Sequence, residues 1–281
     1  MFFLYTEHMK KMYLSLILAC SLLFAGIGCA RVPYDAKTMN VTAFSIGKAD
    51  SILLQYDGYN VLIDAGEQDD GADVVEELAA RNVEKLDLFL VTHFDKDHIG
   101  GADAVIAHVP IDRMLVPNYV VDTKQYQQMQ VAMTAQNVTA EVLTADITFT
   151  LGDATFIVWV STIAYDGNDN EQSLITKVLY DGASLLFMGD AEEEWLKALT
   201  FSGRNLTCDV MKLPHHGVYD ESLEALFLLT LPSYVLVTDS EKNPMEEETE
   251  DILKFFETEY RCTKDGNIVL RIQAGQIAFV S

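Results

Sequence analysis

Hydrophobic residues recur along this chain with two different periods, one typical of strands and one typical of helices. Residues 41–56 and 60–63 are rich in apolar and β-branched side chains, and the Asp57-Gly58 pair between them is a hairpin signal. Residues 71–82 instead repeat apolar side chains at the spacing of one helical face. The pattern predicts a strand hairpin followed by a helix.

The same two periods alternate through the rest of the chain. Strand patterns occur at residues 86–91, 147–151, 155–160, 174–180, 184–188, 210–213, 234–237, 268–272 and 276–280. Helix patterns occur at residues 191–200, 222–229 and 245–260. Strand blocks with interleaved helices in both halves predict an α/β fold with two sheets packed face to face and helices outside, an αββα four-layer sandwich. We expect a single domain over residues 40–281, after a short linker at 30–39.

Residues 1–29 differ from the rest of the chain. Lys10 and Lys11 precede an apolar stretch at 12–28 that ends in small residues. A basic start, an apolar middle and a small-residue end are typical of a secretory signal peptide. The alternative is a membrane anchor, but a transmembrane helix needs about 20 apolar residues and this stretch is short for one. The pattern therefore predicts export.

Cys29 closes this segment. Residues 26–29 resemble a bacterial lipobox, in which the cysteine is lipidated, although a glycine stands where leucine is usual. We predict a lipoprotein-type signal peptide and an extracytoplasmic protein held at the membrane through lipidated Cys29, with free secretion as the alternative. Met9 directly precedes the two lysines, so either Met1 or Met9 can be the true start.

Composition and charge narrow the functional classes. The chain has 281 residues of which 49% are hydrophobic, enough for one large core, and its formal net charge is −24. The acidic excess is spread through the chain and repels nucleic-acid backbones and anionic membranes at long range. Stable binding of duplex DNA is therefore not expected. Outside the predicted signal peptide only Cys208 and Cys262 remain, and we expect buried free thiols because so few cysteines make no disulfide scaffold.

The richest chemistry lies directly after the predicted strand at residues 86–91. Two imidazoles and two carboxylates fall within six positions, at His93, Asp95, Asp97 and His98. Mixed nitrogen and oxygen donors of this kind suit divalent zinc or manganese. The alternative is an ordinary solvated turn, but such turns do not concentrate two histidines and two aspartates after a buried strand. The run therefore predicts a metal site.

The spacing within this run suggests which of its side chains bind the same ion. His93 and Asp95 lie two apart and point the same way if the backbone is extended. Asp97 and His98 are adjacent, so we expect them to diverge and to serve a second ion. Gly100 and Gly101 allow the backbone to bend close behind them.

Three other predicted strands also end in polar groups. Asp64 follows one strand, Asp190 follows another, and the adjacent His215 and His216 follow a third. Any one of these alone is more typical of a helix cap or a turn than of a ligand. In packed-sheet folds, strand ends on one edge converge, so the four strand ends are expected to share one cleft.

Together these blocks resemble the metallo-β-lactamase superfamily, and within it the hydrolase domain at the C-terminus of the ComEC competence proteins. The matching blocks lie at residues 46–51, 62–66, 92–101, 170–174, 188–192, 212–217 and 260–268. The resemblance covers about residues 40–281. It implies two divalent ions, zinc or manganese, and hydrolysis by a hydroxide that bridges them.

The resemblance also implies roles for single residues. One ion would take His93, Asp95 and Asp190, and the other would take Asp97, His98, Asp190 and His216. His215 and Asp97 are the catalytic candidates, with His215 free to donate a proton or a hydrogen bond, although the opposite assignment of the two adjacent histidines stays open. Five further residues are expected to orient ligands or to contact substrate: Asp50, Asp64, Asn170, Ser173 and Lys212.

Two departures from the superfamily pattern affect the metals. Asp95 replaces a histidine that many members carry, and the histidine of the third motif is absent, with Asn170 near its place. One of the two positions is thus poorer in nitrogen donors, which shifts its preference toward manganese or leaves it weakly filled.

Three functions fit these residues. The leading one is an exported metal-dependent hydrolase that acts on phosphoester or phosphodiester bonds of a small or oligomeric substrate. The second is a hydrolase of a lactone, amide or thioester, because one fold hosts many chemistries. The third is a surface binding module without catalysis, against which the complete set of His93, Asp97, His98 and Asp190 argues.

Overall fold

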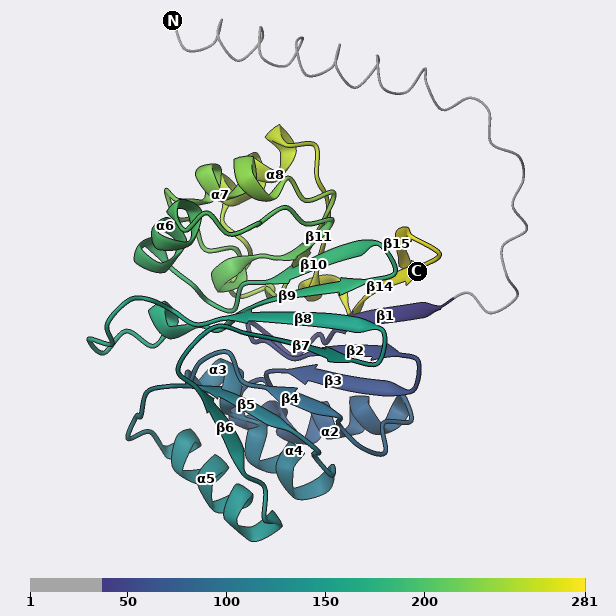
Figure 1. The fold of residues 1–281 in the computed structure, drawn as a ribbon, viewed down its shortest axis with the longest axis vertical. Helices are drawn as coiled ribbons and strands as arrows, with labels where there is room; N and C mark the ends of the chain where they lie inside the picture. Colours follow the sequence, from purple (N-terminus) through teal and green to yellow (C-terminus); the bar gives the residue numbers. More distant parts are fainter. Residues whose placement is uncertain (1–36, 281) are drawn as a thin grey trace, which may run out of the picture. The chain divides into compact units, whose positions relative to one another are not determined.

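The computed structural model describes residues 37–280, and these form four layers with two sheets at the centre (Figure 1). The predicted signal peptide and Cys29 lie outside the described residues. In the first sheet the strands follow the order β15-β14-β1-β2-β3-β4-β5-β6. The second sheet has the order β13-β12-β11-β10-β9-β8-β7. This arrangement confirms the predicted αββα sandwich.

The strands of the first sheet come from both ends of the described chain: β1 (Thr38–Ala43), β2 (Ile52–Tyr56), β3 (Tyr59–Ile63), β4 (Leu88–Leu90), β5 (Met114–Pro117), β6 (Ala140–Leu143), β14 (Ile268–Gln273) and β15 (Gln276–Val280). Those of the second sheet are β7 (Ile147–Leu151), β8 (Ala154–Trp159), β9 (Ile175–Tyr180), β10 (Ala183–Phe187), β11 (Val210–Lys212), β12 (Tyr234–Val237) and β13 (Glu259–Cys262). Because β1 starts at Thr38, its first two residues lie in the segment predicted as linker.

Helices cover the outer face of each sheet, as Figure 1 shows. Beside the first sheet lie α2 (Gly71–Ala80), the short α3 (Lys96–Ile99), α4 (Ala102–His108) and α5 (Lys124–Gln136). Beside the second lie α6 (Glu193–Phe201), α7 (Leu223–Thr230) and α8 (Glu247–Phe255). No helix among residues 37–280 is long and apolar enough to cross a membrane.

The apolar side chains form three buried clusters that hold the layers together. Along β2, Ile52 and Leu54 belong to the cluster between the sheets, whereas Leu53 belongs to the cluster under the first helical layer. A third cluster, around Trp195, lies between the second sheet and its helices. Successive residues of a strand point to opposite faces, so a sheet covered on both sides needs near-continuous apolar strands.

The sheet topology brings the chemically rich strand ends to one edge. The strands β3, β4 and β5 pair in parallel, as do β10, β11 and β12. The carboxyl ends of parallel neighbours lie at the same edge, and in open α/β sheets ligands bind there. The loops after β3, β4, β10 and β11 carry Asp64, the metal run at 93–98, Asp190 and the two adjacent histidines.

Two expectations about the elements were wrong in detail, and one stretch contains elements that no pattern indicated. The β-rich run at 41–56 is two strands separated by a loop at 44–51. The helix predicted over 245–260 is α8 alone, because the chain turns at Glu257, whose φ is 56°, and continues as edge strand β13. Residues 102–143, which show no clear period, contain α4, β5, α5 and β6.

The two described cysteines behave as expected. Cys208 and Cys262 are both buried and neither is in a disulfide. Burial raises the pKa of each thiol to about 12, which keeps both protonated and unreactive at neutral pH.

Candidate metal centre

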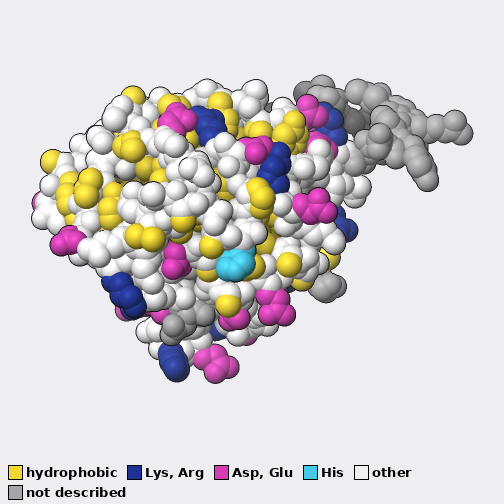
Figure 2. Space-filling model, turned by 90° about the horizontal axis from the view of Figure 1, so that it is seen from below, with side chains coloured by type: hydrophobic (Ala, Val, Ile, Leu, Met, Phe, Trp, Pro, Cys, Tyr) yellow, Lys and Arg dark blue, Asp and Glu magenta, His cyan; other side chains and the backbone are white. Residues whose placement is uncertain are grey.

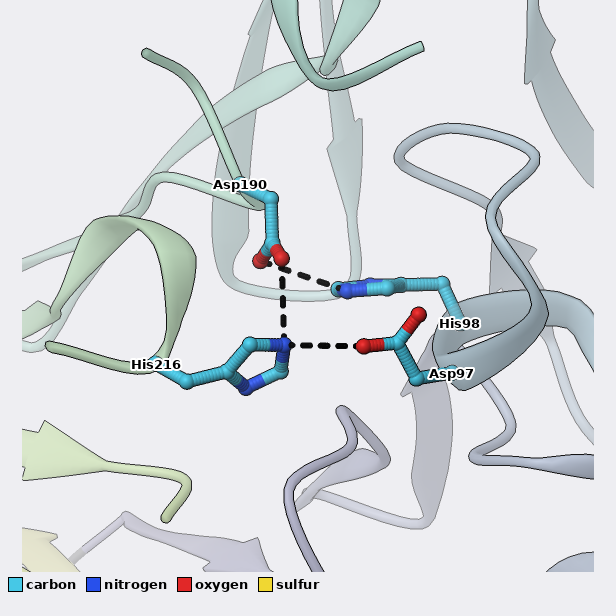
Figure 3. A group of neighbouring side chains, drawn as sticks. All are labelled: Asp97, His98, Asp190 and His216. Atoms are coloured by element: carbon cyan, nitrogen blue, oxygen red, sulfur yellow. Dashed lines mark ion pairs between the residues drawn. The ribbon is translucent and has the colours of Figure 1, made fainter. Parts of the chain in front are cut away.

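Four side chains from three of these loops converge on one point (Figure 3). Asp97, His98, Asp190 and His216 each offer one ligand atom, and these atoms all lie within 4.8 Å of one another. Asp190 Oδ1 is 3.2 Å from His98 Nε2, and Asp190 Oδ2 is 3.0 Å from His216 Nε2. Asp97 Oδ2 lies 3.5 Å from the same nitrogen of His216. We call this set the four-residue group.

The backbone behind the group explains why its members meet. Asp97 and His98 were expected to diverge, but they lie in the short helix α3, where His98 turns toward Asp190 and Asp97 toward His216. The amide of Ala65 donates to the carbonyl of His98 at 2.8 Å, which holds this helix against the loop after β3. A Cβ on Gly101 would lie 2.3 Å from the carbonyl oxygen of Ala65, so only glycine permits this close packing.

The loop that carries His216 has an unusual backbone. His215 and His216 both have positive φ angles, 46° and 56°, a region that non-glycine residues seldom occupy. The amide of His215 donates to the carbonyl of Gly189 at 3.2 Å, which ties this loop to the one carrying Asp190. Such local strain is held by surrounding contacts and clusters at functional sites.

The histidines of the site present free nitrogens, as metal ligands do. Nδ1 of His98 donates to Asp64 at 2.8 Å, and Nδ1 of His216 donates to the carbonyl oxygen of Thr238 at 2.9 Å. In each ring Nε2 is left buried without a hydrogen-bond partner of good geometry. A ligating histidine characteristically uses one nitrogen for the metal and the other for a carboxylate or carbonyl. The residues therefore fit a divalent ion.

Charges within the group depend on one another. Burial alone would raise the pKa of Asp190, but the neighbouring His216, His98 and Lys212 hold it well below its usual range. Burial alone would lower the pKa of His98 and His216, but Asp190 outweighs it and raises both. A divalent ion binds the neutral imidazole, so at rings whose pKa is raised metal uptake is expected to release protons.

Around this group lie the residues expected to orient ligands. Asp64 accepts hydrogen bonds from the amide and the hydroxyl of Thr92 at 2.8 and 2.7 Å besides the one from His98. The hydroxyl of Ser173 accepts from the amide of Asp190 at 3.1 Å. These contacts fix the backbone and the ring orientation at the edge of the group.

Lys212 lies beneath the group and does not reach the surface. It is 1% exposed, forms a buried ion pair with Asp50, and donates to the carbonyl of Gly189 at 3.0 Å. Its ammonium is also 3.4 Å from Asp190 Oδ1. Contact with a substrate, one of the two roles considered for Lys212, is incompatible with this burial.

His93 and Asp95 lie beside the four-residue group, not in it. The rings of His93 and His98 are 4.0 Å apart, and Nε2 of His93 is 3.8 Å from Asp95 Oδ2. The side-chain nitrogen of Asn170 donates to Glu192 Oε1 at 2.7 Å, and its Oδ1 is buried without a partner. Whether the implied first ion takes His93, Asp95 and Asp190 stays a prediction.

His215 stands at the rim and has a partner that the sequence did not indicate. Its Nδ1 is 3.2 Å from Glu192 Oε1, and Glu192 Oε2 accepts from the side-chain Nδ2 of Asn168 at 2.8 Å. Glu192 belongs to a block already matched to the family, but only the fold brings it to His215. The pair opens on a cleft of about 200 Å³ lined by Ala191, Glu192, Glu193, Pro214, His215, Val218, Tyr219 and Asp220.

Comparison with known proteins agrees with this geometry. Residues 46–238 match the family model described as the metallo-beta-lactamase superfamily. The chain belongs to this superfamily. The match spans the loop after β1, the metal run, Asp190 and the two adjacent histidines, and so confirms the family resemblance.

Relatives and solved structures support the same placement. ComE operon protein 3 of Bacillus subtilis (strain 168) is 25% identical over 181 residues, 64% of this chain and 23% of that protein. The matched part of this chain thus spans about a quarter of the length of that relative. Among solved structures, the metallo-beta-lactamase fold protein YhfI from Bacillus subtilis aligns with a TM-score of 0.56 at 13% identity, covering 87% of this chain and 100% of that one. A diphosphatase of the PhnP family aligns with a TM-score of 0.51 at 15% identity, covering 84% and 98%.

Proposed function

We propose that the protein is an exported, divalent-metal-dependent hydrolase of phosphoester or phosphodiester bonds. The observation that carries the proposal is the four-residue group, in which two carboxylates and two imidazoles with free Nε2 atoms meet beside an open cleft. Zinc or manganese bound there would lower the pKa of a water molecule and offset the negative charge that develops at the reacting phosphorus.

The side chains of the group would supply both nitrogen and oxygen ligands to such ions. His98 and His216 supply nitrogen, Asp97 and Asp190 supply oxygen, and Asp64 and the Thr238 carbonyl fix the two rings. Because Asp97 is 21% exposed while the other three are buried, the open side of the group faces the solvent through Asp97. A substrate would approach from that side.

His215 is the residue we assign to proton transfer. The ring of His215 lines the cleft with Nδ1 directed at Glu192. Burial lowers the pKa of His215, and the carboxylate of Glu192 opposes this by stabilising the ring when it carries a second proton. In that state His215 can deliver a proton to the leaving oxygen. It lies outside the four-residue group, which supports His216 as the ligand of the two.

Replacing His215 with alanine is expected to reduce kcat roughly 100-fold or more, as removal of a general acid does, with bound metal unchanged. Turnover and elemental analysis on the same preparation give both numbers. The matched control is Glu193→Gln, because Glu193 lines the same cleft and forms its ion pair with Lys197, on the next turn of α6. A His215→Ala protein that loses its metal would show that the two histidines have the opposite roles.

One solved structure supports phosphoester hydrolysis, and two other functions are the alternatives to it. The aligned PhnP-family structure is that of a diphosphatase, although at 15% identity the likeness concerns the fold. The alternatives are hydrolysis of a lactone, amide or thioester, and binding without catalysis. We favour hydrolysis of a phosphoester over hydrolysis of the other bonds. Bound divalent ions with a proton donor beside them stabilise a five-coordinate phosphoryl transition state well.

A comparison of substrate classes tests this choice. Manganese-loaded protein should hydrolyse bis(p-nitrophenyl) phosphate, and chelator should abolish the activity. The same preparation should turn over a model lactone and a model thioester much more slowly. Rapid lactone or thioester hydrolysis without phosphodiesterase activity would contradict the proposal in favour of the second function, and no hydrolysis at all would favour a binding module.

The net negative charge of the protein favours a small or oligomeric substrate over duplex DNA. The net charge is −24, and on the face that Figure 2 shows, acidic and basic side chains are interspersed without a continuous basic patch. A duplex needs several neutralised phosphates for stable binding. A short phosphodiester at a metal-neutralised cleft does not.

The proposed location rests on the sequence of residues 1–29. We expect the full chain, expressed in a bacterium, to fractionate with membranes and to be labelled by a palmitate analogue. Cys29→Ser should lose the label and leave the protein released or unprocessed, and Cys208→Ser is a control that changes only a buried thiol. A cytosolic, unlabelled wild type with residues 12–28 intact would contradict export.

A further inference from the structure

The helical layer over the second sheet carries large apolar side chains that face the solvent. Phe201, the last residue of α6, is 89% exposed, and Leu228 and Leu231, at the end of α7, are 63% and 59% exposed. The two helices lie side by side (Figure 1). Because both return along parallel strands, they end on the same side of the molecule. We call these three side chains the apolar patch.

Backbone conformation and charge both set the apolar patch apart from the rest of the surface. Leu231 has a φ of 47°, a left-handed conformation that ends a helix and ordinarily takes glycine or asparagine. In a chain of net charge −24, residues 225–238 contain no charged side chain. Residues 198–208 contain only Arg204, which pairs with Asp146. Exposed apolar patches are typical of sites that bind another protein or a membrane.

The apolar patch lies at the edge of the molecule opposite the metal centre. Helices α6 and α7 lead into the starts of β11 and β12, whereas Asp190 follows the end of β10. The starts of β3 and β10 also lie together at this edge, since Tyr180 donates to Asp57 at 3.2 Å between the turns that precede them. Strand β1 runs parallel to β3, with the antiparallel β2 between them, so its first residue, Thr38, lies at the same edge.

We propose that the apolar patch docks on the surface of the lipid bilayer to which Cys29 anchors the chain. Only residues 30–37 separate Cys29 from β1, and eight residues span at most roughly 30 Å. The edge where β1 begins is therefore held near the lipid headgroups, and the apolar patch lies on this edge. Phenylalanine and leucine side chains gain free energy by burial at the boundary of headgroups and acyl chains.

Charge and topology define the kind of membrane and the orientation of the site. An anionic lipid surface repels a protein of net charge −24, so the patch fits a surface of zwitterionic lipid. Docking through this edge turns the metal centre toward the aqueous side, which favours a dissolved substrate over a lipid of the same membrane. The inference rests on the proposed lipid anchor and not on the bond that is hydrolysed.

Fluorescence of single labelled cysteines tests the contact in the full chain. Membrane-held Leu228→Cys protein is labelled with a thiol-reactive nitrobenzoxadiazole dye and reconstituted into phosphatidylcholine vesicles that contain spin-labelled lipid. Cys208 and Cys262 are buried and their thiols have raised pKa values, so they do not take up the dye. The matched control is Val120→Cys, an apolar residue 72% exposed in the loop after β5, at the opposite edge.

The lipid should quench more than about half of the emission from position 228, because interfacial side chains lie about 5–10 Å into the headgroup boundary. It should leave the emission from position 120 nearly unchanged. Equal quenching at both positions, or quenching at neither, would overturn the inference while the anchor stands. A label at position 228 that is shielded from an aqueous quencher but not quenched by lipid would overturn it in favour of a second copy or another protein.

Two further measurements separate failure of this inference from failure of the proposals on which it depends. A wild type that takes up no palmitate analogue and stays out of the membrane fraction would overturn the anchor and the docking together. Turnover of bis(p-nitrophenyl) phosphate by the same vesicles reports on the proposed hydrolase and does not depend on the quenching. Absence of turnover with strong quenching at position 228 would therefore contradict the proposed function and support the docking.

Discussion

An Asp190→Ala protein is expected to lose bound metal and with it all measurable hydrolysis. Asp190 contacts both imidazoles of the four-residue group, at 3.2 Å for His98 and 3.0 Å for His216. Without it the site loses an oxygen ligand and the charge that holds the cationic groups together. Loss of a residue outside the ligand shell typically weakens metal binding about 10- to 100-fold, so loss of this ligand should exceed 100-fold.

Elemental analysis after dialysis, together with turnover, measures both effects. The matched control is Asp209→Ala, an aspartate at the opposite end of β11 from the site, which accepts hydrogen bonds from Ser184. Thermal unfolding should show that both variants fold. A folded Asp190→Ala protein that keeps its metal would refute the assignment of this centre.

The second large effect is expected on stability. Lys212→Met removes the cation beneath the site and leaves Asp50 buried without its partner. Breaking a buried ion pair by removing one member costs about 3–5 kcal/mol, because the remaining charge is uncompensated. The free energy of unfolding, measured in urea on metal-free protein, should fall by about this amount.

Two further variants separate charge burial from general effects of the substitution. Lys254→Met breaks an exposed pair with Glu250 and should leave stability close to that of wild type. Adding Asp50→Leu to Lys212→Met removes the orphaned acid and should recover part of the loss. A Lys212→Met protein as stable as wild type would show that the ion pair between Lys212 and Asp50 does not stabilise the fold at the site.

The sequence predicted the site better than it predicted the peripheral elements. Polar residues directly after apolar strands are informative, because parallel strands bring their ends to one edge. Asp64, His98, Asp190 and His216 could therefore be placed together without a structure. Helix α5 could not be predicted, because among its residues only Met129 and Met133 are buried, and so little burial leaves no clear period.

Contacts between distant segments account for what the sequence could not show. Asp97 and His98 converge because α3 turns them to one side, whereas an extended backbone would separate them. Glu192 meets His215 only because loops after different strands fold over the same edge. The matched block at residues 188–192 includes Glu192, but no local pattern indicates that it meets His215.

The proposal that bound divalent metal drives phosphodiester hydrolysis is tested most directly by reconstitution. Chelator-stripped protein is titrated with Mn²⁺, and the turnover of bis(p-nitrophenyl) phosphate is measured at each level of bound metal. We predict no turnover in the stripped protein and a rise that follows occupancy until the metal sites are full. Full turnover without metal, or no turnover at full occupancy, would contradict the proposed function.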